Sequence, residues 1–389
     1  MERIAFYSGS FDPFTYGHLA VLAQASMMFD HVVVGVGCNP NKKAYLTDKE
    51  KVTIIDQSIK DLASMYGHRE LIGREFSPAD AYLAQHPEKV SVVTYKGLTI
   101  DAAVEWGASV MIRGERLIGD HDEEMRLAQV NQELCAVRGY NLQTVIIPVP
   151  DIKLTYTSST TVRNLFSLGE YVVAMNYVTP SVHNLLVEKS LRQEYGLLTG
   201  GCNHDVKDLF GTYQTRKYHN FSHISYMLNF MNIFIRATSI RLDKSAMKMA
   251  IFWHDFYQGE DAEELSSVRA KQAAKASGIS PEDVQKLIMA TKHNVIDGQK
   301  LDEMSELIHD LDLAILGDNK NYGIYAYRVR EEYAESVDYE IYVKNRIKLL
   351  NSFLEKERIY LTQYFFERFE SIARENIRKE RDFWGSKNL

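Results

Sequence analysis

The sequence predicts an α/β domain with a parallel sheet, followed by a second domain built of helices alone. Short apolar stretches alternate with amphipathic helical patterns over about the first half of the chain, whereas from Val206 onward only helical patterns occur, separated by short turns. The chain is 389 residues long, which exceeds the length at which one hydrophobic core usually stops growing, roughly 250–300 residues. Two domains are therefore expected.

Five short strands are expected in the first domain, because each is an apolar run bounded by turn residues. Their expected ranges are 4–7, 32–37, 90–95, 109–112 and 144–148. Helical patterns separate the strands, so the strands should be parallel. The carboxyl ends of parallel strands meet at one edge of the sheet, where ligands bind in folds of this class.

The two domains are expected at residues 1–195 and 205–389, with residues 196–204 as the linker. Three glycines interrupt the preceding helical pattern there, Gly196, Gly200 and Gly201. The second domain then continues with helical segments such as the one that begins at Pro281.

The most informative motif follows the first expected strand and reads SGSFDPFTYGH over residues 8–18. A strand, a turn and a helix opening at Gly17 and His18 would aim backbone N–H groups and an imidazole at a bound phosphate. Gly9 and Gly17 let the backbone approach an anion closely, while Ser10 and His18 converge on it. This motif predicts a phosphate-transfer site.

A second motif, YTSSTTVR over residues 156–163, follows the strand expected at 144–148. Its hydroxyl side chains are natural helix N-caps, so a helix should begin within it. An ordinary helix cap is the alternative explanation for this motif alone. Together with residues 8–18, it favours a second contact to phosphate.

These motifs resemble the nucleotidylyltransferases of the T/HxGH class and, within them, the bacterial phosphopantetheine adenylyltransferase family, over about residues 3–189. Three further stretches carry the resemblance: NPNKK at 39–43, MIRGER at 111–116 and QVNQEL at 129–134. The resemblance implies a Rossmann-like domain that transfers AMP from ATP, with Mg2+, to 4'-phosphopantetheine, giving dephospho-coenzyme A and pyrophosphate. It also implies a place in coenzyme A biosynthesis and a homo-oligomer.

The same resemblance implies roles for individual residues. The attacking phosphate is already anionic, so the protein has to align the reactants and neutralise charge rather than supply a base. The implied catalytic residues are His18, Ser10, Lys42 and Arg113. The implied ATP-binding residues are Gly9, Ser10, Phe11, His18, Arg116, Glu124, Tyr156, Ser158, Ser159 and Thr160. The implied acceptor-binding residues are Ser10, Lys42, Leu98, Arg113 and Asn131. Ordinary surface charges are the alternative for the two arginines.

The chain also departs from the family pattern. Ser8 stands where a proline is usual, Ser10 where a threonine is more usual, and Glu123 where an aromatic residue often lies. None of these changes removes an essential charge. The stretch at about 65–90 is longer than the family pattern and could reshape the acceptor site, so another phosphorylated acceptor, such as nicotinamide mononucleotide, is the alternative substrate.

The second half of the chain contains histidines and carboxylates dispersed along expected helices. They occur in KYHNFSH at 217–223, WHDFY at 253–257 and DLD at 310–312, with a further histidine at 293. Such a set is what a buried divalent-metal site in a helical domain requires. The alternative is that these side chains satisfy buried polar groups without a metal.

This half resembles the HD-domain phosphohydrolases, over about residues 205–383. The resemblance implies a metal-dependent phosphohydrolase acting on an unidentified phosphorylated substrate, with Mn, Fe, Co, Ni or Mg as the metal. The implied metal ligands are His223, His254, Asp255 and Asp312. The candidates for a second metal, a substrate contact or an acid/base role are His219, Glu264 and His293. A non-catalytic nucleotide sensor or an oligomerisation module is the alternative for this domain.

Composition argues against other classes of protein. The net charge of -7 disfavours general nucleic-acid binding. Cys38, Cys135 and Cys202 are scattered without a disulfide or metal spacing, so reduced thiols are expected. No apolar stretch approaches the length of a membrane span, and the first residues form a strand pattern rather than a signal segment. A cytoplasmic enzyme is expected.

Overall fold

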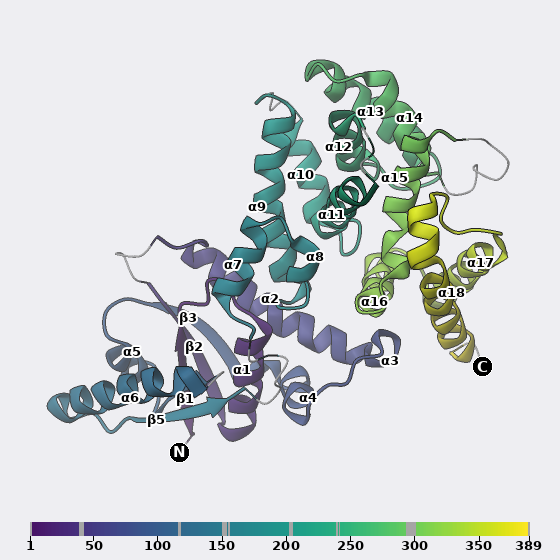
Figure 1. Ribbon diagram of the computed structural model, residues 1–389. Helices are drawn as coiled ribbons and strands as arrows, with labels where there is room; N and C mark the ends of the chain where they lie inside the picture. The colour runs from purple at the N-terminus through teal and green to yellow at the C-terminus, as the bar shows by residue number, and fades with distance from the viewer. Residues whose placement is uncertain are drawn as a thin grey trace. The chain divides into compact units, whose positions relative to one another are not determined.

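The computed structural model describes residues 2–38, 43–115, 118–149, 154, 156–201, 205–238, 240, 242–292 and 301–387. The chain divides into two compact units (Figure 1). Unit 1 comprises Met1–Arg69 and Glu75–Leu185, and unit 2 comprises Glu70–Arg74 and Leu186–Leu389. Unit 1 contains a sheet covered by helices, whereas the described part of unit 2 is helical.

Unit 1 is built on a five-stranded parallel sheet, as predicted, with the strand order β3-β2-β1-β4-β5. The strands are β1 (Ile4–Gly9), β2 (His31–Gly37), β3 (Val90–Tyr95), β4 (Val110–Glu115) and β5 (Gln143–Pro148). From β1 the chain moves outward through β2 to β3, and then crosses back to β4 on the other side of β1. The carboxyl ends of β1 and β4 therefore flank a topological switch point, which is where open α/β sheets bind ligands.

Two groups of helices connect the strands, and two further helices follow β5. The elements are α1 (Tyr16–Met28), α2 (Asp48–Gly67), α3 (Arg69–Ile72), α4 (Pro78–Gln85), η1 (Pro87–Lys89), α5 (Thr99–Glu105), α6 (Ile118–Arg138), α7 (Ser159–Ser167) and α8 (Tyr171–Ala174). Helices α1, α2 and α4 pack together, and α5 packs with α6. Because crossovers between parallel strands are right-handed, the reversal of direction at β1 places these groups on opposite faces of the sheet.

The core under α5 and α6 is formed by apolar residues of the sheet and of both helices. Phe6 pairs in register with Val33 and Met111 on the neighbouring strands, and the three side chains pack with Ile100 of α5 and Cys135 of α6. Burial on this face fixes the register of β1, because a shift by one residue would turn Phe6 to the other face. The register in turn sets where the switch-point residues lie.

Unit 2 is a helical domain. Its elements are the end of α9 (Pro180–Leu198), α10 (Val206–Gln214), α11 (Phe221–Thr238), α12 (Lys244–Trp253), α13 (Ala262–Ala276), α14 (Pro281–Met289), α15 (Glu303–Leu313), η2 (Ala314–Gly317), α16 (Tyr322–Tyr333), α17 (Tyr339–Glu355) and α18 (Gln363–Ser386). Its core is rich in aromatic side chains, among them the fully buried Trp253.

The boundary between the units lies within α9, earlier than the linker expected at 196–204. Tyr195 is buried in unit 2, where its ring lies 5.0 Å from that of Phe252 and its hydroxyl accepts a hydrogen bond from Trp253 Nε1 at 3.1 Å. Burial raises the pKa of Tyr195 to about 12. Gly200 and Gly201, both with positive φ, follow the end of α9.

Among the described residues, no helix is both long and apolar enough to cross a membrane. Cys38 and Cys135 are free thiols, and Cys202 lies outside the described residues.

Candidate active sites

A cavity of about 240 Å³ lies at the switch point of unit 1. It brings together residues of the first motif and the two residues that follow the expected strand at 109–112, Arg113 and Gly114. The lining is Tyr7, Ser8, Gly9, Ser10, Phe11, Gly17, His18, Val21, Arg113, Gly114, Glu124 and Val149. Of the implied site residues, Gly9, Ser10, Phe11, His18, Arg113 and Glu124 therefore share one cavity.

The hydrogen bonds of His18 determine which of its nitrogens carries a proton. Thr15 is the N-cap of α1, and its backbone N–H donates to Nδ1 of His18 at 3.1 Å. The Thr15 hydroxyl also lies 2.9 Å from Nδ1. Since Nδ1 accepts the backbone hydrogen bond, the neutral imidazole has its proton on Nε2. The rings of Phe11 and Phe14 lie 5.3 and 5.5 Å from the imidazole and restrict its rotation.

The two sequence motifs of unit 1 lie against each other. A Cβ atom at Gly17 would lie 3.1 Å from the carbonyl oxygen of Thr157, so this position favours glycine. Ser159 donates a hydrogen bond to the carbonyl of Pro13 at 2.7 Å. Ser158 is the N-cap of α7 and accepts from the N–H of Thr161. The hydroxyls of Ser158 and Ser159 are thus used to build the site, and the N-terminus of α7 begins beside the first motif.

Arg113 and Glu124 hold each other. Nε and Nη2 of Arg113, on β4, donate to the two carboxylate oxygens of Glu124, on α6, at 2.5 and 3.0 Å. Both side chains are mostly buried, with exposed fractions of 24% and 17%. Charge-assisted hydrogen bonds at two points are stronger than neutral ones, and they hold the guanidinium in a fixed orientation. Arg113, which is implied to bind the acceptor, and Glu124, which is implied to bind ATP, therefore form one ion pair.

Asp12 belongs to the first motif, but the sequence implies no role for it. Its carboxylate accepts hydrogen bonds from the N–H groups of Tyr45 and Leu46, both at 2.8 Å. The backbone carbonyl of Asp12 accepts a hydrogen bond from Arg163. Asp12 thereby ties the chain just after residues 39–42 to the first motif. No sequence pattern pairs an aspartate with backbone groups more than thirty residues away.

The remaining implied residues of unit 1 lie elsewhere or are not described. Lys42 and Arg116 lie outside the described residues. Leu98, Asn131, Tyr156, Ser158, Ser159 and Thr160 do not line the described cavity. Leu98 and Tyr156 are exposed. The long stretch at 65–90 forms α3, α4 and η1 after the end of α2, and it contributes no lining residue to this cavity.

The cytidylyltransferase-like family matches residues 6–165. The phosphopantetheine adenylyltransferase of Chelativorans sp. is 39% identical over 168 residues, which are 43% of this chain and 86% of that protein. The chain belongs to the phosphopantetheine adenylyltransferase family. The Roseiflexus sp. member is 34% identical over 193 residues, 50% of this chain and 98% of that protein. The Bartonella quintana member is 37% identical over 184 residues, 47% of this chain and 91% of that protein. These adenylyltransferases correspond to the first half of the chain, which is unit 1.

In unit 2, the four implied metal ligands lie together. His223 comes from α11, His254 and Asp255 follow α12, and Asp312 comes from α15. One potential ligand atom from each lies within 4.8 Å of all the others. Nε2 of His223 lies 3.0 Å from the Asp312 carboxylate, and Nε2 of His254 lies 3.0 Å from the Asp255 carboxylate. The turn after α12 directs both side chains of the adjacent pair inward.

The proton positions in this cluster suit a cation at its centre. Nδ1 of His254 lies 2.9 Å from the carbonyl oxygen of Ile251 and so must donate, which leaves a lone pair on Nε2 of the neutral ring. That Nε2 lies 3.1 Å from Nε2 of His223.

One carboxylate oxygen of the cluster is left without a hydrogen bond. Oδ2 of Asp255 is buried and has no hydrogen-bond partner, although Nε2 of His254 is only 3.0 Å away. The two atoms are close but not aligned as donor and acceptor. Two imidazoles and two carboxylates, with an unsatisfied oxygen at their centre, fit a divalent metal. These residues would hold it.

The candidates in unit 2 for a second metal, a substrate contact or an acid/base role are His219, Glu264 and His293. His219 lines a cavity with Asp255 and Asp312, and its Nδ1 lies 2.6 Å from Glu332. Glu332 also accepts from the N–H groups of Tyr218 and His219 and from Gln258. Burial raises the pKa of Glu332, but His219 and these donors hold it at about 2.

Glu332 was missed by sequence analysis, because it lies more than a hundred residues from His219. Glu264 is paired with Lys292 and does not line the cavity, whereas the neighbouring Glu263 does. His293 lies outside the described residues.

Proposed function

We propose that unit 1 transfers AMP from ATP to 4'-phosphopantetheine, giving dephospho-coenzyme A and pyrophosphate. An oxygen of the acceptor phosphate forms a bond to the α-phosphorus of ATP, and the bond between the α-phosphorus and the bridging oxygen of the β-phosphate breaks. The observation that carries this proposal is the switch-point cavity, where His18 and Arg113 converge in the half of the chain that is 34–39% identical to phosphopantetheine adenylyltransferases.

The residues of unit 1 would act on charge rather than on protons. Nε2 of His18 would donate a hydrogen bond to an oxygen of the transferred phosphate, and the backbone around Gly9 and Ser10 would approach the same group. Lys42 and Arg113 would neutralise the phosphate of the acceptor. The N-terminus of α7 would face the triphosphate, whose charge Mg2+ would partly neutralise.

Adenylyl transfer by a His18→Ala variant tests the proposed role of His18. Its contact is expected to strengthen in the transition state, so the variant should lose turnover far more than ATP affinity. Steady-state kinetics with ATP, Mg2+ and 4'-phosphopantetheine measure both quantities. A loss confined to ATP affinity would contradict the role.

We further propose that unit 2 is a metal-dependent phosphohydrolase of the HD type. The cluster of His223, His254, Asp255 and Asp312 supports this proposal. A divalent ion held there would lower the pKa of a bound water and stabilise negative charge on phosphoryl oxygens. The chain itself would hold the cluster in place, and His219, fixed by Glu332, would face the reacting group from the same cavity.

Metal content and phosphate release together test the second proposal. Asp255→Ala should lose both the bound metal and any metal-dependent release of inorganic phosphate from phosphate esters. Asp261→Ala is the matched control, because Asp261 is exposed and its side chain makes no cap hydrogen bond on α13. Metal bound by the wild type without any hydrolysis would favour the sensor instead.

A further inference from the structure

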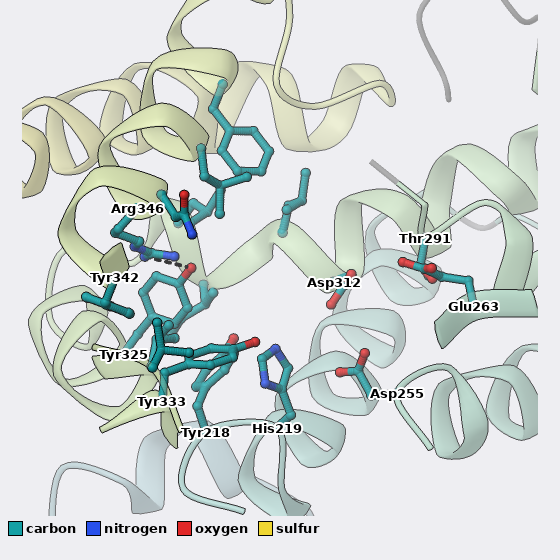
Figure 2. Close-up of a pocket in the computed structure, with 18 residues that line it drawn as sticks. Tyr218, His219, Asp255, Glu263, Thr291, Asp312, Tyr325, Tyr333, Tyr342 and Arg346 are labelled. Atoms are coloured by element: carbon teal, nitrogen blue, oxygen red, sulfur yellow. Dashed lines mark hydrogen bonds between the residues drawn. The ribbon is translucent and has the colours of Figure 1, made fainter. Parts of the chain in front are cut away.

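The cluster of His223, His254, Asp255 and Asp312 in unit 2 opens onto a second cavity. The inference drawn from this cavity rests on the phosphohydrolase proposal. The cavity measures about 410 Å³ and is lined by residues that include Asp255 and Asp312. Its volume falls within the range of small-molecule sites, roughly 300–1,000 Å³. Figure 2 shows Tyr218, Tyr325 and Tyr333 on one side of the two carboxylates.

The side of the cavity beyond the carboxylates is a wall of tyrosines, defined here as Tyr218, Tyr325, Tyr333 and Tyr342 (the tyrosine wall). The rings of Tyr218 and Tyr325 meet edge to face with their centroids 4.7 Å apart. Apolar side chains complete the lining, among them Leu313, Ile315, Leu316, Val329 and Val337. Such a surface suits ring or apolar faces of a ligand.

The cations of this lining are already paired. Arg346 is buried, and its guanidinium donates to both carboxylate oxygens of Glu380 at 2.8 and 3.0 Å. Nη2 of Arg346 also donates to the hydroxyl of Tyr325 at 3.1 Å. His219 is paired with Glu332. Among the described lining residues, no cation therefore lacks a carboxylate partner; Arg330, whose guanidinium lies 4.9 Å from the ring centroid of Tyr342, does not line the cavity. A second or third phosphate along the tyrosine wall would therefore meet no free cation of the lining.

One polar group of the tyrosine wall lacks a partner. The hydroxyl of Tyr342 is buried and makes no hydrogen bond. Buried polar groups are hydrogen-bonded in the great majority of cases. A polar atom on a ligand that occupies the cavity would satisfy this hydroxyl without bringing a charge.

We propose that the tyrosine wall binds the organic group of a phosphate monoester. This group is uncharged, has ring or apolar faces, and presents one polar atom to Tyr342. In the hydrolysis, a water oxygen forms a bond to phosphorus, the ester P–O bond breaks, and the departing alcohol takes up the proton that the water loses. Unit 2 therefore acts on monophosphates in preference to triphosphates.

Two matched comparisons of substrates test the class. Phosphate release with Mn2+ is measured for 1-naphthyl phosphate against glycerol 3-phosphate, and phosphate or pyrophosphate release for uridine 5'-monophosphate against uridine 5'-triphosphate. We expect kcat/KM to be at least tenfold higher for the first member of each pair. Equal values within both pairs would overturn the inference.

Binding of 1-naphthol to the metal-free full chain provides a readout that does not depend on hydrolysis. Leu349 lines the cavity and is 39% exposed, so Leu349→Trp should fill the cavity and weaken 1-naphthol binding at least tenfold. Tyr342→Phe removes only an unpaired hydroxyl and should weaken binding a few-fold without lowering the Tm. Tyr339→Phe, on the same helix but exposed and outside the lining, should leave binding unchanged.

The two proposals fail in different ways. If 1-naphthol binds and Leu349→Trp abolishes binding while no ester is hydrolysed, the phosphohydrolase proposal is wrong and the ligand class of the wall stands. If esters are hydrolysed but 1-naphthol does not bind, and glycerol 3-phosphate is hydrolysed as well as 1-naphthyl phosphate, the tyrosine wall does not select the substrate.

Discussion

Arg113 and Glu124 form a two-contact ion pair in the switch-point cavity, at 2.5 and 3.0 Å. A substrate phosphate that binds Arg113 must therefore share the guanidinium with a carboxylate, and the two anions repel each other. The pair holds the guanidinium in position but weakens its attraction for phosphate. These two effects on phosphate binding can be measured separately, because each residue of the pair can be substituted on its own.

Glu124→Gln should tighten the binding of 4'-phosphopantetheine a few-fold in the absence of ATP, because it removes the competing charge and keeps a hydrogen-bond acceptor beside Arg113. Arg113→Ala should weaken the same binding at least tenfold, since hydrogen bonds to charged groups contribute about 1.5–3 kcal/mol. Calorimetric titration measures both. Glu133→Gln, exposed on the same helix, is the control. Weaker binding by Glu124→Gln would show that the carboxylate only orients the arginine.

Thr15→Val should reduce turnover, because the Thr15 hydroxyl lies 2.9 Å from Nδ1 of His18 and helps to fix the imidazole. Loss of the helix cap should also lower the free energy of unfolding by about 1 kcal/mol. Thr47→Val loses an equivalent capping box on α2 and lies outside the cavity lining. Both variants should melt earlier, and only Thr15→Val should lose kcat. A kcat of Thr15→Val equal to that of Thr47→Val would show that the Thr15 hydroxyl does not position His18 for catalysis.

Asp12→Ala should raise the KM for the acceptor, because it releases the N–H groups of Tyr45 and Leu46, which directly follow the lysine-containing stretch at 39–43. The lost carboxylate should also cost about 1–3 kcal/mol of stability. Asp30→Ala is the control, because Asp30 likewise accepts from a backbone N–H, that of Arg3, but lies outside the cavity lining. An unchanged KM in Asp12→Ala would separate this loop from acceptor binding.

Mn2+ should raise the Tm of unit 2, because a ligand that binds only the folded state stabilises it by about 2.7 kcal/mol at one hundred times its Kd. Differential scanning calorimetry with Mn2+ and with EDTA measures the shift. Asp312→Asn should abolish the shift, and Asp261→Asn should preserve it. A shift that persists in Asp312→Asn would place the ion elsewhere.

Asp302 makes part of the stability of unit 2 depend on pH. Its carboxylate pairs with Lys286 and caps α15 through the N–H of Ser305, and these contacts lower its pKa to about 2. A lowered folded pKa stabilises above the unfolded value and loses that effect as pH falls through the folded value. Because the pair is half exposed, we expect Asp302→Ala to cost about 1 kcal/mol at neutral pH.

The effect of Asp302→Ala should shrink between about pH 4 and pH 2. Urea unfolding at several pH values measures it. A cost that stays constant over this range would mean that the carboxylate charge contributes nothing.

Local patterns predicted much of this molecule. Apolar runs predicted all five strands. The resemblance to HD-domain phosphohydrolases implied His223, His254, Asp255 and Asp312, whose ligand atoms lie within 4.8 Å of one another. The strands were predictable because the burial of a strand is encoded in neighbouring residues.

The remainder depends on contacts between distant residues. Nothing local in the sequence pairs Asp12 with Leu46 or His219 with Glu332, because a carboxylate can accept from any donor that the fold brings near. The burial of Tyr195 against Phe252 likewise joins residues that are far apart in the sequence. Partners chosen by tertiary packing are visible only in the structure.

The most direct test of the account is the product formed by the purified chain from ATP and Mg2+ with either 4'-phosphopantetheine or nicotinamide mononucleotide, identified by mass together with pyrophosphate release. We expect dephospho-coenzyme A and pyrophosphate with 4'-phosphopantetheine, and no adenylylated product with nicotinamide mononucleotide. Product from nicotinamide mononucleotide alone, or none from 4'-phosphopantetheine, would contradict it.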